Sequence, residues 1–124
     1  MKNSHYTQAT NTETQENNKI IAEFMGYEIQ KDPTERFFGR YKTPITKVWV
    51  KENELSFDSD WNWLMPVLIE IGNKTGFALT LGENYCYWNN DGENPFAREY
   101  GGYDNILNIY EAVVDLIKWY NENK

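Results

Sequence analysis

The residues that could form a nucleophilic site are one cysteine, Cys86, and one histidine, His5. A thiol nucleophile needs a base beside it, and His5 lies in the polar stretch MKNSHYTQATN, which has almost nothing to bury. We therefore expect Cys86 to be a small apolar strand residue. There is also no cluster of His and Cys with zinc spacing and no glycine-rich phosphate loop. The sequence thus predicts no metal site and no cofactor.

Paired carboxylates offer a second kind of chemistry. Asp58 with Asp60, and Asp91 with Glu93, are the closest acidic pairs in the chain. Glycosidases use two such groups, one as acid and one as base or nucleophile. Helix capping explains the first pair and a solvated loop explains the second. We therefore expect a protein that is not an enzyme.

Aromatic residues provide the third possibility, which is recognition. Tyr85 and Tyr87 alternate on one face of a predicted strand, and Trp88 takes the other face. Either a second layer covers both faces, or one pair points away from the core. Exposed tyrosines beside Asp91 and Glu93 would form an aromatic and acidic patch suited to a protein partner. The alternative is a small-ligand or carbohydrate-binding domain with these aromatic residues in a concave pocket.

The segment DSDWNWLMPVLIEIG (58–72) reads as a helix with capping residues at its start and a glycine at its end. Positions two apart on a helix differ by about 200°, so Trp61 and Trp63 cannot share a face. Two apolar stripes follow, one with Trp61, Leu64, Met65 and Leu68, the other with Trp63, Val67 and Ile71. This pattern predicts a helix buried on more than one side.

The face that carries Trp63 needs a cover. The first or last helix could lie across it, the segment Tyr27–Tyr41 could fold over it, or a second copy of the chain could supply the surface. Trp63 is therefore a candidate partner-binding residue, and a homodimer is one of the options. Pro66 should kink this helix if the helix begins at Asp58–Asp60.

The remaining elements follow from periodicity and turn residues. Residues 1–11 are expected to be a disordered polar tail, and residues 12–124 a single domain. We expect a first helix from Thr12 to Met25, irregular structure over 27–41, a β-branched strand over 45–50, a hairpin over 77–88 and a loop over 89–102.

The last helix should begin near Asp104, a good cap residue, and has the strongest periodicity of the chain. Its stripe comprises Ile106, Ile109, Tyr110, Val113, Ile117 and Tyr120. Helices and hairpin strands in this order predict an α+β fold. We expect a small antiparallel sheet packed with about three helices, as a two-layer or α–β–α sandwich.

The net charge of −7 limits the possible partners. Affinity for nucleic acid comes mainly from Lys and Arg that neutralise phosphates, and the sequence has no basic run. We therefore expect no direct nucleic acid binding and no attraction to an anionic membrane, whereas a basic protein partner fits. The chain shows neither a membrane-spanning apolar stretch nor a signal peptide, so we expect a cytoplasmic location.

Three stretches carry a family resemblance, namely IAEFMGYE (21–28), DWNWLMPVLIEI (60–71) and EAVVDLIKWYNE (111–122). They resemble recurring segments of small uncharacterised proteins encoded by Bacteroidetes-type bacteria and their phages, and more distantly phage-type domains with an α–β–α sandwich. The resemblance covers about a third of the chain and carries no residue with an assigned activity. It implies an acidic accessory protein that binds another protein, such as one that interferes with a host defence or regulatory system, in the bacterial or host cytoplasm.

Overall fold

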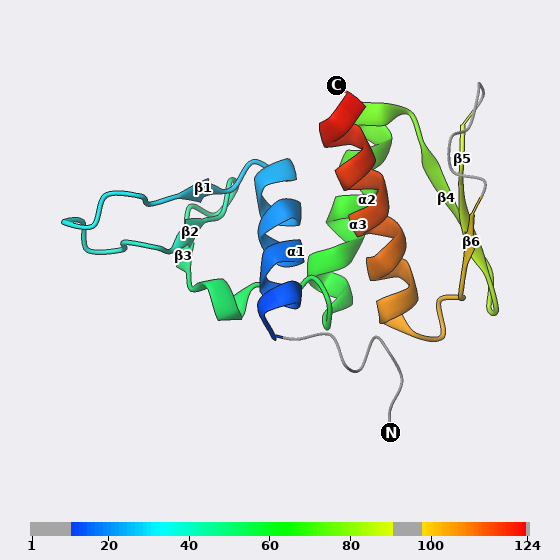
Figure 1. The fold of residues 1–124 in the computed structure, drawn as a ribbon, viewed down its shortest axis with the longest axis horizontal. Helices are drawn as coiled ribbons and strands as arrows, with labels where there is room; N and C mark the ends of the chain where they lie inside the picture. The colour runs from blue at the N-terminus through cyan, green and yellow to red at the C-terminus, as the bar shows by residue number, and fades with distance from the viewer. Residues whose placement is uncertain (1–10, 91–97, 124) are drawn as a thin grey trace. The chain divides into compact units, whose positions relative to one another are not determined.

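The computed structural model describes residues 11–90 and 98–123. Within these residues the chain forms three α-helices and two three-stranded antiparallel sheets, which confirms the predicted α+β class (Figure 1). The chain divides into two compact units, Met1–Leu55 and Ser56–Lys124. The single domain expected over residues 12–124 stays a prediction. The polar tail expected over residues 1–11 lies outside the described residues except for Asn11, which begins the first helix.

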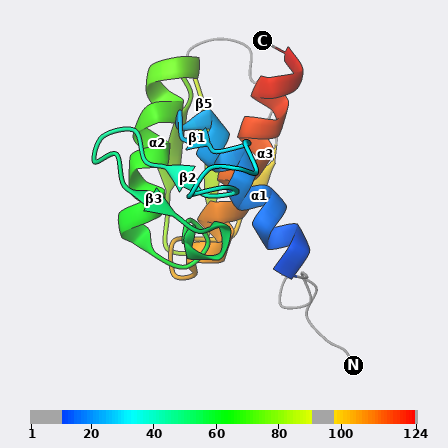
Figure 2. The same cartoon turned by 90° about the vertical axis from the view of Figure 1, so that its left-hand side faces the viewer.

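The first unit contains α1 (Asn11–Phe24), β1 (Glu28–Ile29), β2 (Tyr41–Lys42), β3 (Trp49–Val50) and the short 3-10 helix η2 (Glu52–Glu54). The three strands form a sheet in the order β1-β2-β3 and face the viewer in Figure 2. The buried Asn18 of α1 donates a hydrogen bond to the Leu55 carbonyl oxygen at 3.0 Å. Because a buried amide without a partner is costly, this bond fixes the end of the unit against α1.

Two expectations for this unit were wrong. Residues 27–41 are not wholly irregular, since they hold β1 and the start of β2. The strand expected over 45–50 is reduced to Trp49–Val50, and Ile45 lies in a turn with 90% of its surface exposed. Strands of two residues are too short to show an alternation in sequence, so their pairing depends on partners far along the chain.

The second unit begins with α2 (Trp61–Thr75). The Asp60 side chain accepts a hydrogen bond from the Asn62 amide at 2.8 Å, which satisfies a free donor of the first turn. Gly76 ends the helix with a φ of 80°, a conformation that glycine adopts without strain. Pro66 stands inside the helix and cannot donate the backbone hydrogen bond of its position.

The expectation that α2 is buried on more than one side was wrong. Its buried residues, Leu64 from one predicted stripe and Val67 and Ile71 from the other, lie together on one side of the helix. A different stripe of large apolar residues is exposed instead, namely Trp61 (37%), Met65 (42%) and Ile69 (66%). Only one of the apolar faces of this helix is therefore used in the core of the chain.

The predicted hairpin is confirmed as β4 (Ala78–Leu81) and β5 (Cys86–Asn89), and β6 (Glu99–Tyr100) adds a third strand beside β5. The register pairs Leu79 with Trp88 and Cys86 with Tyr100. Both α2 and α3 (Ile106–Asn123) lie on the same side of this sheet (Figure 1). The unit is thus a sheet with one face covered by helices, as expected for an α+β arrangement.

The last helix begins near Asp104, as expected, but its cap is one residue later. The Asn105 side chain, rather than Asp104, accepts the hydrogen bond from the Leu107 amide, at 3.0 Å. The predicted stripe is buried at Ile109, Tyr110, Val113 and Ile117, and Ala112, Val114 and Leu116 are buried as well. The helix buried on several sides is therefore α3, not α2.

Candidate functional site

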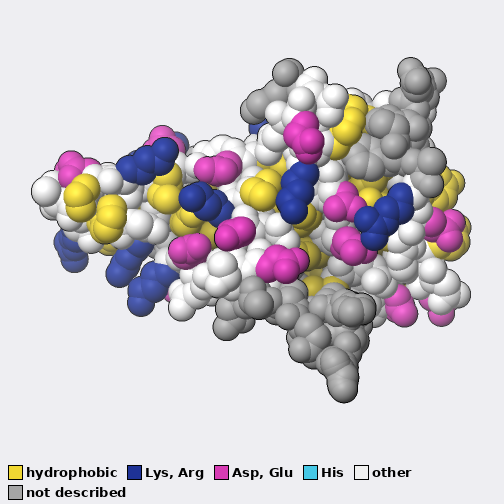
Figure 3. Space-filling view, viewed as in Figure 1, with side chains coloured by type: hydrophobic (Ala, Val, Ile, Leu, Met, Phe, Trp, Pro, Cys, Tyr) yellow, Lys and Arg dark blue, Asp and Glu magenta, His cyan; other side chains and the backbone are white. Residues whose placement is uncertain are grey.

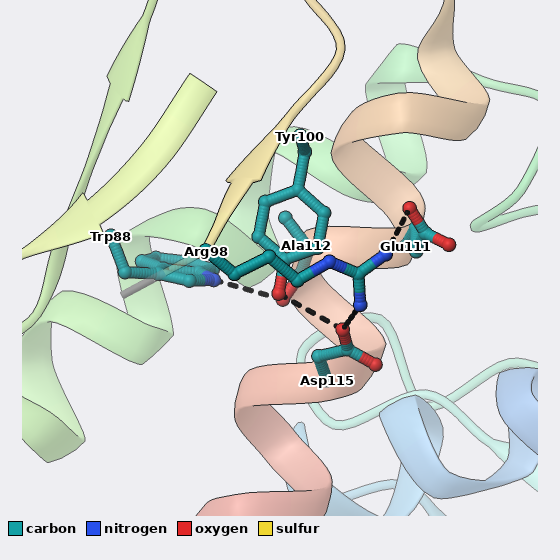
Figure 4. A network of polar contacts seen from close by, with 6 residues as sticks. All are labelled: Trp88, Arg98, Tyr100, Glu111, Ala112 and Asp115. Carbon is teal, nitrogen blue, oxygen red and sulfur yellow. Dashed lines mark hydrogen bonds and ion pairs between the residues drawn. The ribbon is translucent and has the colours of Figure 1, made fainter. Parts of the chain in front are cut away.

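A polar network anchors the second sheet on α3 (Figure 4). The fully buried Trp88 donates its indole N–H to the Ala112 carbonyl oxygen at 2.9 Å. The Tyr100 hydroxyl donates to Asp115 Oδ2 at 2.9 Å, and Arg98 Nη1 donates to the same oxygen at 2.7 Å. Trp88 and Tyr100 belong to strands and Arg98 immediately precedes β6, and all three contact the same face of α3. The network therefore fixes the position of the sheet on this helix.

Arg98 holds this network together from the surface. Its second terminal nitrogen, Nη2, pairs with Glu111 Oε1 at 3.2 Å, and its guanidinium lies 4.5 Å from the centroid of the Tyr100 ring. Burial, the hydrogen bond to Asp115 and the charge of Asp115 raise the pKa of the Tyr100 hydroxyl well above its usual value. The hydroxyl therefore stays protonated and serves as a donor. These contacts describe a structural anchor, since every polar atom named has a partner within the chain.

The described residues give little support for nucleophilic or metal chemistry. Cys86 is fully buried, as expected, and burial together with the charges of Glu111 and Glu99 raises its pKa to about 11. A thiol that stays protonated at neutral pH is a poor nucleophile. In residues 11–90 and 98–123, no three His, Cys, Asp or Glu side chains gather closely enough to hold a metal ion. His5 lies outside the described residues.

The opposite face of the second sheet carries the two tyrosines that the sequence singled out. Alternation along β5 buries Cys86 and Trp88 and turns Tyr87 outward, with 39% of its surface exposed. Tyr85 lies just before β5 on the same face and is 42% exposed. Of the two alternatives in the sequence, the structure thus has the exposed one. We call this surface the tyrosine face, comprising Ala78, Thr80, Tyr85, Tyr87, Asn89 and Glu99.

The two tyrosine rings are held in place by their neighbours. They stack on one another with centroids 6.2 Å apart and planes 17° from parallel. A side chain at Gly82 would collide with the Tyr85 ring, so that ring lies directly on the glycine backbone across the hairpin. The Gly82 amide also donates to the Tyr85 carbonyl at 2.8 Å. Because the rings already pack against each other and against Gly82, a partner would lose less side-chain entropy by binding them than by binding isolated tyrosines.

The acidic half of the predicted patch has a different composition from the one expected. Asp91 and Glu93 lie outside the described residues. Within the described part of the chain, Glu99 pairs with Tyr87 across β5 and β6 and is exposed. Sequence reasoning missed Glu99, because a strand of only two residues, Glu99–Tyr100, shows no alternation that could assign its neighbour.

Trp63, the remaining candidate, lies on α2 rather than on the tyrosine face. It is half-buried and meets the ring of Phe57 edge-on, with centroids 5.3 Å apart. Phe57 belongs to the segment immediately before the helix and is 1% exposed. None of the three proposed covers therefore accounts for this contact, which is local. The exposed apolar stripe contains Trp61 instead.

Comparisons with other proteins do not supply a function. In the described part of the chain no helix combines the length and the apolar character needed to cross a membrane. No protein-family model, curated protein or solved structure shows significant similarity to the chain.

Proposed function

We propose that this protein is a non-enzymatic protein-binding module and that the tyrosine face is its docking surface. The observation that carries the proposal is the stacked, exposed pair Tyr85 and Tyr87 on a sheet face that no described helix of its unit covers. Tyrosine is enriched among residues that dominate binding energy, because it offers a large apolar area and a polar end.

Charge favours a basic partner for this surface. All of the net charge resides in the second unit, where Ser56–Lys124 contains eleven Asp and Glu against four Lys and Arg, a net charge of −7. Glu99 places one of these charges beside Tyr87. A field of this sign accelerates the encounter with a basic protein and rejects acidic ones.

A carbohydrate ligand is the competing function, since aromatic rings can also stack on sugars. The Tyr85 ring lies on the Gly82 backbone and stacks with Tyr87, so part of its surface is already occupied within the chain and less of it is open to stack on a sugar. A protein surface can use the remaining exposed ring surface together with the two hydroxyls.

The resemblance to small phage-type proteins suggests which partner class to examine first. An acidic accessory protein of that kind would act by occupying a surface of a host defence or regulatory protein. This role requires binding and no chemistry, in agreement with the protonated, buried Cys86.

The test is affinity capture from the cells that produce the protein, with three baits. The baits are the wild type, Y85S/Y87S and the control Y103S, which removes a tyrosine that is 51% exposed but lies outside the strands. We expect a partner that the wild type and Y103S retain and that binds purified Y85S/Y87S at least about tenfold more weakly. Equal affinity of all three baits for every captured protein would contradict the proposal.

A homodimer formed through the tyrosine face must be distinguished from a complex with a different protein. Light scattering on a sizing column across a concentration series gives the mass of the wild type and of Y85S/Y87S. A dimer that the double substitution dissociates would replace the heterologous partner with a second copy of the chain. A monomer in both cases leaves the face free for another protein.

A further inference from the structure

The sheet of the first unit carries a cluster of cations and rings that the overall charge conceals. Phe37 stacks on Trp49 with centroids 5.4 Å apart and planes 18° from parallel. Arg36 and Arg40 lie over the Phe37 ring, with their guanidinium carbons 5.5 Å and 5.6 Å from its centroid. Lys42 Nζ lies 5.7 Å from the centroid of the Trp49 ring. We call these five residues the cationic cluster.

The three cations are not neutralised by their neighbours. None of Arg36, Arg40 and Lys42 forms an ion pair with any residue that the structure describes. Their side chains contact aromatic faces, which attract a cation but leave its N–H donors available. An arginine guanidinium whose N–H donors are available can form two parallel hydrogen bonds to the two oxygens of a carboxylate.

The sequence around the cationic cluster also carries an excess of positive charge. Residues 30–51 contain six Lys and Arg against two Asp and Glu, although Met1–Leu55 as a whole has eight of each. In Figure 3 the Lys and Arg side chains gather over the β1–β3 segment with hydrophobic side chains between them. Phe38 adds an apolar side chain next to the cluster, with 54% of its surface exposed.

We propose that the cationic cluster is a second docking surface, which binds a protein segment carrying acidic and apolar side chains. Arginine and tryptophan, like tyrosine, are among the residue types enriched at positions that dominate binding energy in protein interfaces. Two forks and one ammonium suit a few discrete carboxylates, and the stacked rings with Phe38 suit an adjacent apolar side chain. This inference does not depend on the tyrosine face, which has the opposite charge and lies in the other unit.

A nucleic acid fits the cluster less well than an acidic polypeptide. Phosphate backbones require a continuous positive track, and here Asp32 and Glu35 interrupt the basic residues. The Asp32 carboxylate is fixed by the Thr34 amide at 3.0 Å and the Thr34 hydroxyl at 2.7 Å, contacts that lower its pKa and keep it charged. The net charge of −7 further repels a long polyanion.

The test is selection of binders from a random-peptide display library on the immobilised full chain. Selected peptides are then measured against the wild type, R36Q/R40Q and the control K31Q/K47Q. The control removes the same charge from the same segment but leaves the cation–ring contacts intact. We expect peptides enriched in Asp, Glu and large apolar residues that bind R36Q/R40Q at least about tenfold more weakly and the control at most about threefold more weakly.

Several results would overturn the proposal. These are a selection without enriched peptides, peptides without an excess of acidic residues, or an equal loss of binding in both double variants. Single-stranded oligo-dT that binds the wild type while acidic peptides do not would assign the cluster to nucleic acid. The variant R36K/R40K keeps the charge and removes the fork, so a loss of binding there with an unchanged circular dichroism spectrum separates recognition from folding. The Y85S/Y87S variant should bind these peptides normally, which distinguishes this surface from the tyrosine face.

Discussion

The contact between Trp88 and α3 offers a direct measure of how the second sheet is anchored. In W88F the indole N–H that donates to the Ala112 carbonyl oxygen is lost, and a smaller ring occupies a site with 0% exposure. The lost hydrogen bond costs about 0.5–1.5 kcal/mol. The ring shrinks by roughly 40 Å³, which at about 24 cal/mol per Å³ of cavity costs on the order of 1 kcal/mol. We therefore expect W88F to lower the free energy of unfolding by about 1.5–2.5 kcal/mol.

Urea unfolding followed by circular dichroism measures this change, provided that the slope with urea stays constant. The matched control is W61F, at a tryptophan that is 37% exposed, for which we expect a change within about 0.5 kcal/mol. W88A should cost more, about 3–5 kcal/mol, because most of the ring volume is lost. A W88F loss no larger than that of W61F would refute the reasoning, since it would mean that Trp88 is neither tightly packed nor hydrogen bonded.

Three further predictions concern other parts of the second unit. W63A should lower the free energy of unfolding by about 2–4 kcal/mol in urea titrations without changing the mass in solution, because its ring packs edge-on against Phe57; a stable monomer from a dimeric wild type would contradict this. The free energy of unfolding should fall as pH rises from about 9 to about 11, because the Cys86 thiol ionises in the unfolded chain while its pKa of about 11 keeps it protonated in the folded chain. In unfolding curves measured across this pH range, C86A should show a smaller fall. G102A should cost about 1–3 kcal/mol by the same assay, because its new methyl group would collide with the Glu83 backbone, and an unchanged midpoint would show that the turn can move.

Several features of the fold could be predicted because they are local. The stripe of α3 repeats over many turns, and the hairpin shows alternation on both sides of a turn, so each pattern identifies its element without knowledge of the rest. Alternation also separates Tyr87 from Trp88 on opposite faces of β5. The residues of the tyrosine pair were therefore identifiable from the sequence, and so was the fact that they share a face.

Other features depend on partners far along the chain. The sequence showed that Trp61 and Trp63 face different ways but could not decide which side of α2 is buried, because that depends on contacts with other elements. The strands β1, β2 and β3 have two residues each and exist only through their cross-strand partners. Nothing in the spacing of Glu99 assigns it to Tyr87.

The charged residues show most clearly the difference between what the sequence determines and what only the tertiary structure decides. The sequence by itself determined the sum, −7, and from that sum we expected a basic partner and no polyanion. Only the tertiary structure decided where the charges lie, with Arg36, Arg40 and Lys42 gathered around two stacked rings and without a described ion-pair partner. The physical reason is that binding depends on charges within a few ångströms of the partner, because salt and water screen the more distant ones. The net charge of the chain does not contain the positions of the charged side chains, because those positions are set only when the chain folds and the strands pair.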